Sequence, residues 1–588
     1  MKNKKAFTMV ELLGVIIILS FITLVVTINI IKIQKDKELE LFESSVNSIV
    51  RSAQMYYANN SFINYPISGI AANSSELDLV NNQVFTTGSI KLVDNEYFFV
   101  DNVSNGKFCA VGVRNDLTII NGPCPETPNR CFEFDSKTGT ITKYLKNKVG
   151  CDISNPTVPS QINGVAVKNI GKLAFANYEY MNCSNNEWKT TVKVTNTSDI
   201  DKYLSCSASM DTFDKTHYFT VVSVSLPSTI EKIDDMAFSN NNISILNSSN
   251  LPSLKYIGNS AFELNNIISL NLSKNLLLGK IGDNAFLGNN ISNLILEGAS
   301  NLTEIGTKAF MNNKIETLNL SNFPLIKEIK DNTFNNNLIN TLTIANLPNL
   351  EIIGESSFAN NVIKNLTLEN FLKLTTIKNQ AFMRNSFSSV IIRNLPVFKT
   401  FGFYSFGASI VNTLVIDNLP ILTEIGESAF RDNNIIINNM ALTNLPSVTK
   451  IGNMTFHSSF VQSPSGTLDL TGMPNLEFID YWAFNFNQFD NIIFNSNIKR
   501  ISDEAFRGYG ALKTTNLGEL KKLEIIGEQT FRNNIINSLI IPENVNSIGN
   551  SAFFNSKELK SVTILGIDPK RFNTNWTAIG WPSSLKPL

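Results

Sequence analysis

A repeat of 24 residues dominates the pattern of apolar and polar positions along the chain. From Phe238 to Phe430, a phenylalanine that ends an I-G-x-x-A-F-like block recurs every 24 residues, eight times in succession. A strict period of about 20–29 residues is typical of solenoids, in which successive coils stack on one another. The same phenylalanine occurs outside this stretch, at Phe175, Phe456, Phe484, Phe506, Phe531 and Phe553.

The apolar positions within one turn predict its structure. Counted from each phenylalanine, they fall at +5, +8, +10, +13, +16 and +19, which in one turn are Ile339, Leu342, Ile344, Leu347, Leu350 and Ile353. Positions +8 and +10 alternate with polar residues, which predicts a short strand with one face inward. The small residues of the I-G-x-x-A-F block predict a tight helical turn that approaches its neighbours. We expect the phenylalanine rings to stack into a central column.

Position +3 is asparagine in eight of the nine turns from Phe238 to Phe430, and Ser409 is the exception. The asparagines are Asn241, Asn265, Asn289, Asn313, Asn337, Asn361, Asn385 and Asn433. An amide side chain can both donate and accept hydrogen bonds, so it can satisfy backbone groups at a corner of the coil. The fixed register favours a buried asparagine ladder over loop asparagines that merely suit turns.

This pattern resembles the bacterial leucine-rich repeats of the BspA-like type, over about residues 160–566. The predicted fold class is therefore an α/β repeat, a leucine-rich-repeat solenoid with short strands and short helical turns. The resemblance implies surface display and the binding of a protein or matrix ligand that it does not name. The repeats follow a small β-rich head, and we expect these segments: head 61–130, β N-terminal cap 131–165, repeats 166–566 with an insertion at about 180–222, and C-terminal cap 567–588.

The N-terminus has the pattern of a membrane anchor. Three lysines (Lys2, Lys4 and Lys5) precede an apolar run of twenty residues from Leu12 to Ile31. At about 1.5 Å per residue, this run matches a bilayer core of about 30 Å, with the lysines on the cytoplasmic side. An ordinary signal peptide or a plain signal anchor is the alternative. However, no A-x-A-like site follows the run, and a carboxylate in hydrocarbon, such as Glu11, requires a partner.

The segment KKAFTMVELL resembles the prepilin leader of type IV pilins and pseudopilins. That resemblance implies a leader over residues 1–6, cleaved by a prepilin peptidase after Ala6, where the family more often has glycine. It also implies N-methylation of Phe7 and pairing of Glu11 with the terminal amine of a neighbouring pilin-like subunit. Residues 7–60 would form one long helix, first hydrophobic and then amphipathic.

The outer half of this predicted helix carries an apolar stripe with helical spacing. Its members are Leu39, Phe42, Val46, Ile49, Ala53 and Tyr56. Such a stripe packs either on the head of the same chain or on a partner helix. The pilin plan favours the head.

Composition narrows the classes of partner. Hydrophobic residues make up 43% of the chain and charged residues 17%, with a formal net charge of −1, and 15 of the 40 phenylalanines lie in the repeated column. Loss of the three leader lysines changes the charge from −1 to −4. No basic field exists to bind nucleic acid.

Six cysteines lie outside the regular repeats: Cys109, Cys124, Cys131, Cys151, Cys183 and Cys206. An even number in an exported segment predicts disulfides, for which we expect pairing of sequential neighbours. Free thiols or a metal site are the alternatives. There is no C-x-x-C, and the chain has only two histidines, His217 and His457.

No motif for catalysis, a cofactor or a metal is present: the chain lacks G-x-S-x-G, a P-loop, a Rossmann-type G-x-G-x-x-G and H-E-x-x-H. We therefore expect a binding protein and not an enzyme. The candidate ligand face is the part of the outward +9 column at Thr343, Thr367, Ile391 and Val415; by its spacing the column itself runs on to Asn439. Alternatively, its β-branched residues merely suit a strand.

Together these features predict a pilin-like minor or tip subunit, or a membrane-anchored adhesin, at the bacterial cell surface or in a pilus. In either case the anchor is the membrane helix, and the repeats would bind protein or matrix. The alternative is a structural pseudopilin of a type II secretion or DNA-uptake machine, whose repeats contact machine components.

Overall fold

The computed structural model describes residues 33–56, 70–72, 77, 85, 87–93, 97–113, 116–121, 129–145, 155–176, 182–184, 187–189, 221–460, 466–566, 578–582 and 585. The chain separates into two compact units, Met1–Glu126 and Thr127–Leu588. Each unit is described by itself.

The first unit combines a helix with an antiparallel sheet. The helix covers residues 33–56 and is the only α-helix in the described part of the chain. The sheet has the order β1-β2-β3-β4-β5, and all of its pairs are antiparallel. Its strands are β1 (Ile70–Ala71), β2 (Thr87–Val93), β3 (Tyr97–Ser104), β4 (Phe108–Val113) and β5 (Asp116–Asn121).

The apolar stripe of the helix forms the core of this unit with the sheet. Phe42, Val46, Ile49 and Ala53 are fully buried in one cluster with apolar strand residues such as Val100. Residues spaced three and four apart share one face of a helix, so this face lies on the sheet and the opposite face is exposed. The stripe therefore packs on the head of its own chain.

The predicted membrane span, Leu12–Ile31, and the predicted processing and assembly residues, Ala6, Phe7 and Glu11, lie outside the described residues. Among the helical residues that the structure does describe, no helix has both the length and the apolar character needed to cross a membrane.

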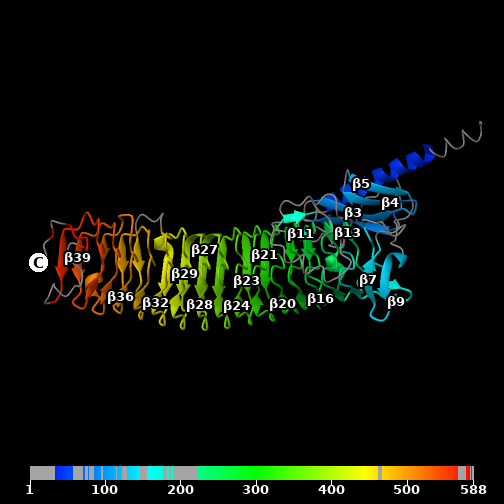
Figure 1. Cartoon of the computed structure of the whole chain (residues 1–588). Helices are drawn as coiled ribbons and strands as arrows, with labels where there is room; N and C mark the ends of the chain where they lie inside the picture. Colours follow the sequence, from blue (N-terminus) through cyan, green and yellow to red (C-terminus); the bar gives the residue numbers. More distant parts are fainter. Residues whose placement is uncertain are drawn as a thin grey trace, which may run out of the picture. The chain divides into compact units, whose positions relative to one another are not determined.

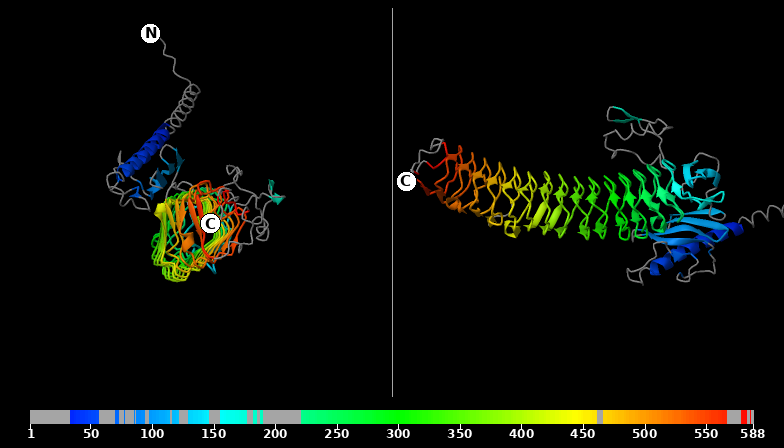
Figure 2. Two further views of the ribbon diagram at one scale, coloured as in Figure 1. Left: turned by 90° about the vertical axis from the view of Figure 1, so that its left-hand side faces the viewer. Right: turned by 90° about the horizontal axis from the view of Figure 1, so that it is seen from below.

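The second unit is a stack of coils, about 14 turns in all, that follow one another in chain order (Figures 1 and 2). Each turn contributes one strand to a narrow parallel sheet and one to a broad parallel sheet. Strands in successive turns pair in register, as Ile257 does with Ile281 in the next turn. A hairpin of β6 (Phe132–Asp135) and β7 (Thr140–Tyr144) begins the narrow sheet.

The narrow sheet continues through two-residue strands: β10 (Asn169–Ile170), β14 (Lys232–Ile233), β16 (Tyr256–Ile257), β18 (Lys280–Ile281), β20 (Glu304–Ile305), β22 (Glu328–Ile329), β24 (Ile352–Ile353), β26 (Thr376–Ile377), β28 (Thr400–Phe401), β30 (Glu424–Ile425), β32 (Lys450–Ile451), β34 (Phe478–Ile479), β36 (Arg500–Ile501), β38 (Ile525–Ile526) and β40 (Ser547–Ile548). Hydrogen-bonded pairing is interrupted between β20 and β22 and between β28 and β30.

The broad sheet is built from the predicted L-x-L segments. Its strands are β13 (Ser223–Val224), β15 (Ile245–Leu246), β17 (Ser269–Asn271), β19 (Asn293–Ile295), β21 (Thr317–Ser321), β23 (Thr341–Ala345), β25 (Asn365–Glu369), β27 (Ser386–Arg393), β29 (Ile410–Asp417), β31 (Met440–Thr443), β33 (Thr467–Asp469), β35 (Asn491–Ile493), β37 (Thr514–Thr515), β39 (Ser538–Ile541) and β41 (Ser561–Ile564).

The second unit contains further short elements. They are the hairpins β8 (Gln161–Ile162) with β9 (Val165–Ala166) and β11 (Asn182–Ser184) with β12 (Glu187–Lys189), and the 3-10 turns η1 (Asn129–Cys131), η5 (Ser248–Asn250), η6 (Ile437–Asn439) and η7 (Leu517–Glu519).

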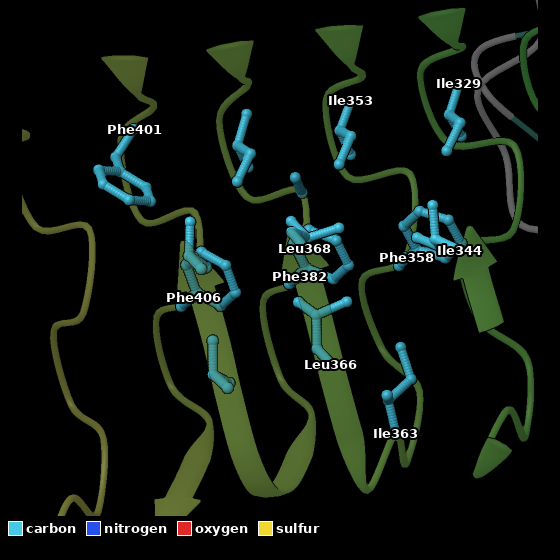
Figure 3. Close-up of a cluster of buried hydrophobic side chains, with 14 of the residues drawn as sticks. Ile329, Ile344, Ile353, Phe358, Ile363, Leu366, Leu368, Phe382, Phe401 and Phe406 are labelled. Atoms are coloured by element: carbon cyan, nitrogen blue, oxygen red, sulfur yellow. The ribbon is translucent and has the colours of Figure 1, made fainter. Parts of the chain in front are cut away.

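The phenylalanine column is confirmed. From Phe238 to Phe553, successive ring centroids lie 5.1–5.7 Å apart, with planes within 11° of parallel. Figure 3 shows three of these rings, Phe358, Phe382 and Phe406, among aliphatic side chains of the two sheets. At the far end, Trp581 stacks on Phe553 at 4.7 Å and continues the column past the last repeat.

The buried asparagine ladder is also confirmed. Asn265 donates from Nδ2 to the carbonyl oxygens of Phe238 at 2.9 Å and Phe262 at 3.1 Å, and its Oδ1 accepts from the Ile243 N–H at 3.0 Å. One amide thus satisfies backbone groups in two coils, and the pattern recurs in the following turns. At the exceptional position, the Ser409 hydroxyl donates to the Phe382 carbonyl at 3.3 Å.

The prediction of short helical turns is wrong, and with it the α/β class, because the described repeats form a β-solenoid without an α-helix. The I-G-x-x-A-F corners are not helical, since alternate N–H groups donate to the next coil: the Phe262 N–H donates to the Ala285 carbonyl at 2.8 Å. Left-handed residues flank the phenylalanine, with φ of 51° at Ser260 and 55° at Leu264. The small residues serve close stacking, because a Cβ on Gly258 would lie 2.5 Å from the Asp235 nitrogen.

Candidate binding surface

The two sheets of the solenoid present chemically different outer faces. The narrow sheet carries ion pairs between turns: Lys280 pairs with Glu304 of the next turn at 3.1 Å, and Lys378 pairs with Glu328 two turns away at 3.0 Å. Exposed pairs of this kind are solvated and contribute little to stability or recognition. The broad sheet, in contrast, has uncharged residues at its outward positions along the predicted ligand column.

The structure places the predicted ligand-face residues on this broad sheet. Thr343 in β23 and Thr367 in β25 are exposed, whereas Ile391 and Val415 are half-buried. Thr367 pairs with Ile391, and Ile391 pairs with Val415, so these three form a continuous row across β25, β27 and β29.

The row does not continue to Asn439, which corrects that part of the prediction. Val415 pairs with Ala441, two residues further on. The interval from Phe430 to Phe456 is 26 residues instead of 24, and the turn η6 (Ile437–Asn439) precedes the strand. The two extra residues therefore lie before β31, and counting from the phenylalanine gives the wrong register there.

The row is also divided between Thr343 and Thr367. Thr343 pairs with Asn319 in β21, but no ladder joins β23 (Thr341–Ala345) to β25 (Asn365–Glu369). We call this boundary the seam. The broad sheet is interrupted in the same way between β15 and β17, β19 and β21, β31 and β33, and β37 and β39. The phenylalanine column continues past the seam, with Phe334 and Phe358 stacked at 5.6 Å.

Backbone hydrogen bonds join neighbouring turns within each ladder of the broad sheet. In regular turns, the N–H at position +10 donates to the next strand, as from Leu272 to the Ile295 carbonyl at 2.8 Å. The N–H at +12 does the same, as from Asn394 to the Asp417 carbonyl at 3.2 Å. β23 and β25 do not share such a ladder.

A hollow of about 910 Å³ lies at the seam. One wall is a continuous stretch of chain, residues 342–348, and the other consists of the outward residues of β25 and the following corner, 370–372. Ser300, Asn322 and Pro324 complete the lining. The volume falls within the range of about 300–1,000 Å³ that is typical of ligand sites.

The lining combines neutral polar groups with apolar side chains. Thr343, Thr367, Asn365 and Asn370 supply hydroxyls and amides, and Leu372 is 68% exposed. No lysine, arginine or histidine lines the hollow. Its single acid, Glu369, accepts from Arg393 Nε at 2.6 Å, so its charge is largely compensated.

The sequence predicts two residues of the hollow, Thr343 and Thr367, as part of the ligand face, but it does not predict the seam. One signal was available at the corner that follows each broad strand. Neighbouring turns have asparagine followed two residues later by proline, as in Asn322 with Pro324 and Asn346 with Pro348. The turn after β25 has Leu372 in place of that proline.

The only described histidine takes part in a packed cluster away from the hollow. His457 Nδ1 lies 3.7 Å from Asp432 Oδ1, and its ring packs on Trp482 at 5.7 Å. The nearby His457, together with a hydrogen bond from the Tyr404 hydroxyl, lowers the pKa of Asp432 despite partial burial. Burial, reinforced by Asp432, raises the pKa of Tyr404 to about 12. His217 lies outside the described residues.

The cysteine prediction is tested at two positions. Cys109 and Cys131 are disulfide-bonded, and the described part of the chain contains no free cysteine. The side chains of Cys124, Cys151, Cys183 and Cys206 lie outside the described residues, so the pairing of sequential neighbours stays a prediction. The described residues also contain no group of three or more acidic, histidine or cysteine side chains placed to hold a metal.

Comparison with protein families gives one match. The model of the BspA type leucine rich repeat region, present in six copies, matches residues 207–339, 327–462 and 465–575. A comparison with curated protein sequences gives no match.

Solved structures resemble the chain at low identity. A leucine-rich repeat protein from Bacteroides ovatus is 16% identical, over 75% of this chain and 88% of that one, with a TM-score of 0.39. The pneumococcal vaccine antigen PcpA is 16% identical, over 87% and 92%, with a TM-score of 0.26. A leucine rich cell surface protein from Faecalibacterium prausnitzii is 15% identical, over 77% and 96%, with a TM-score of 0.23.

Proposed function

The chain belongs to the BspA-type leucine-rich repeat family, and from this premise we propose that it is a surface-displayed binding protein whose broad sheet holds protein or matrix ligands. The observation that carries the proposal is the contrast between the two outer faces. The narrow sheet is covered by ion pairs, whereas the broad sheet is uncharged along the Thr343–Val415 row and hollowed at the seam. The proposed role is binding alone, without a catalytic step.

Two further features support a location outside the cell. The basic leader and the apolar run Leu12–Ile31 have the pattern of an exported, anchored chain. Disulfides such as those of Cys109 and Cys131 persist in oxidising compartments and are rare in the cytosol.

A second part of the proposal concerns how the chain is held at the cell surface, in a pilus or in the membrane. The prepilin-like segment makes the chain a pilin-like minor or tip subunit, or an adhesin that stays in the membrane through the same helix. Its mass of 65.3 kDa favours a minor or tip position, because the heads of major pilins must tile a filament at close spacing. Prepilin peptidase and other pilin-like subunits are then its partners, with Glu11 as the assembly carboxylate.

The binding proposal is tested with matched lysine substitutions in full-length protein displayed on bacterial cells. Thr343→Lys with Thr367→Lys places two charges on the broad sheet, and Thr376→Lys with Thr400→Lys places two on the narrow sheet of the adjoining turns. The probes are immobilised fibronectin, laminin, collagen and bacterial cells. We expect only the first pair to reduce adhesion, by ten-fold or more. Equal adhesion by both pairs and the unsubstituted chain would refute the broad sheet as the binding face.

The assembly proposal has its own tests. Mass spectrometry of the mature protein should show a chain that begins at N-methylated Phe7. Glu11→Ala should abolish incorporation into filaments while surface levels of the repeats are retained. An intact Met1, or cleavage after Ile31, would overturn the leader assignment, and normal incorporation of the Glu11 variant would overturn the pairing.

A further inference from the structure

A cluster of aromatic side chains lies at the corners of three successive turns in the C-terminal half of the solenoid. Tyr481 stacks on Trp482 with ring centroids 4.6 Å apart, and Trp482 packs against His457 at 5.7 Å. His457 also meets Phe486 edge to face at 5.6 Å, and Phe486 stacks on Tyr509 at 5.3 Å. We call these five residues the aromatic platform. Its two outer rings reach solvent, because Tyr509 is 59% exposed and Tyr481 is 38% exposed.

Two rings of the platform occupy backbone positions that suit other residues. Trp482 and Phe486 have φ of 57° and 58°, in the left-handed region that is unfavourable for a bulky side chain. The equivalent positions around Phe334 are Asn332 and Asn336, and asparagine tolerates this region. The turn therefore holds two large rings at a conformational cost, and costs of this kind cluster at functional sites.

Tyr509 departs from the repeat in another way. It stands at position +3 from Phe506, where most turns have the buried amide of the ladder, such as Asn265. The chain has an exposed ring at this position in place of a buried framework residue. Adjoining exposed rings of this kind mark an interaction surface, whereas a single exposed apolar residue does not.

The charged groups beside the platform are paired with one another. Arg507 Nη1 lies 2.7 Å from Glu504 Oε2, and the Arg507 guanidinium lies over the Phe486 ring at 5.3 Å. Arg431 Nε lies 3.2 Å from Asp432 Oδ2, next to the histidine of the platform. A cationic ligand would meet two arginines, and an anionic ligand would meet two acids. These charges therefore favour a neutral ligand.

Hydrogen-bonding groups lie at the edges of the rings. Tyr481 and Tyr509 carry hydroxyls, which can both donate and accept. Burial, and then the nearby carboxylates of Glu504 and Asp503, raise the pKa of Tyr481, so these acids lie close to its ring. Asp503 already accepts from the Glu528 N–H at 2.8 Å. A ligand that stacks on the rings would therefore meet donors and acceptors at their edges.

A carbohydrate has the chemistry that this surface fits, because it combines C–H faces with hydroxyls at their edges. The C–H groups carry partial positive charge and are attracted to the negative face of an aromatic ring. We propose that the aromatic platform binds a neutral glycan chain by stacking its sugar rings on Tyr481 and Tyr509. The inference goes beyond the proposed function, because it adds a second surface, at the corners between the two sheets, and a second class of ligand.

Removing the two exposed rings tests the proposal. The probe is an array of neutral and acidic oligosaccharides, incubated with the full chain in detergent. Neutral oligosaccharides should bind the unsubstituted chain, and Tyr481→Ala with Tyr509→Ala should weaken binding at least ten-fold without changing the melting temperature. Phe478→Ala with Ile493→Ala is the matched control, because it removes two exposed apolar side chains of the same turn, one from each sheet. This control should bind normally.

Failure of every neutral oligosaccharide to bind, or equal binding by the tyrosine variant, would overturn the inference. Binding of acidic oligosaccharides alone would also overturn it. Loss of adhesion to protein probes in the tyrosine variant, without any glycan binding, would assign the platform to a protein ligand instead.

A second set of variants separates stacking from general apolar contact. Tyr509→Trp keeps an aromatic face and should retain binding, whereas Tyr509→Leu keeps apolar area without that face and should weaken it. Bound glycan should also shift the fluorescence of Trp482, and Trp482→Phe should remove that shift. Equal binding by the leucine and tryptophan variants would contradict stacking on the rings.

Discussion

The interior of each coil and the outer face of its broad sheet differ in how regularly their residues repeat. Inside, every turn repeats the same chemistry, with a stacked phenylalanine and a buried amide or hydroxyl at the corner. Outside, equivalent positions change from threonine to isoleucine and valine, and the ladder itself is interrupted at the seam. The repeated positions specify the fold, so the information about function lies where the period is broken.

Removing a ring from the column should have the largest effect. Phe358→Ala deletes a fully buried ring stacked on both neighbours and leaves a cavity, which should lower the free energy of unfolding by about 3–5 kcal/mol. Phe403→Ala in the same region is the matched control, because that ring is 45% exposed. Urea denaturation followed by circular dichroism measures both. Equal losses would contradict the distinction between interior and surface.

Removing one amide from the ladder should have the next largest effect. Asn313→Ala leaves the carbonyls of Phe286 and Phe310 and the N–H of Ile291 without this partner, which should lower the free energy of unfolding by about 2–4 kcal/mol. Asn313→Ser should lose less, because Ser409 fills the same position elsewhere with a hydroxyl. A serine variant as unstable as the alanine variant would show that the hydroxyl is no substitute.

An interior carboxyl should make stability depend on pH. Burial raises the pKa of Glu263 from its ordinary 4.5 to about 7, against the effects of Ser260 and Lys308. The folded chain therefore binds this proton more tightly than the unfolded chain, and stability should fall as the pH rises from about 4.5 to about 7. Glu263→Gln should exceed wild type by up to about 3 kcal/mol at pH 8 and match it at pH 4.

Denaturation midpoints at the two pH values check this prediction. Glu304→Gln is the control, because it removes only a partly exposed ion pair with Lys280 and should change stability by less than about 1 kcal/mol at either pH. A Glu263→Gln variant without a pH-dependent advantage would show that the buried carboxyl does not oppose folding.

The smallest effect on stability is expected on the outer face. Thr343→Lys and Thr367→Lys alter exposed positions without a buried hydrogen bond and should change the free energy of unfolding by no more than about 0.5 kcal/mol each. The same substitutions are expected to reduce adhesion strongly. A loss of stability large enough to explain the loss of adhesion would show that these residues belong to the framework.

The sequence predicts the interior well because the same buried residue types recur at the same spacing in many turns. Phe334 and Asn337 recur with the same spacing in turn after turn, and both the column and the ladder follow from that repetition. The helical corner was wrongly predicted because I-G-x-x-A-F has residues that suit a helix, whereas alternate backbone N–H groups donate to the next coil and break any continuous helical pattern. Stacking between coils is a tertiary effect that the composition of one block does not reveal.

The binding surface is less predictable. Thr343 and Thr367 could be placed on one face by counting, but their separation at the seam depends on how two strands meet in space. Counting also failed at Asn439, because two extra residues precede β31 and shift the register. Leu372, at the position of a proline in neighbouring turns, was the single local sign of irregularity.

Adhesion of bacterial cells that display the full chain tests the central claim most directly. If the broad sheet is the binding face, Thr343→Lys with Thr367→Lys should reduce adhesion by ten-fold or more, whereas Thr376→Lys with Thr400→Lys on the narrow sheet should leave adhesion unchanged. Equal adhesion by both variants and the unsubstituted chain would contradict the account.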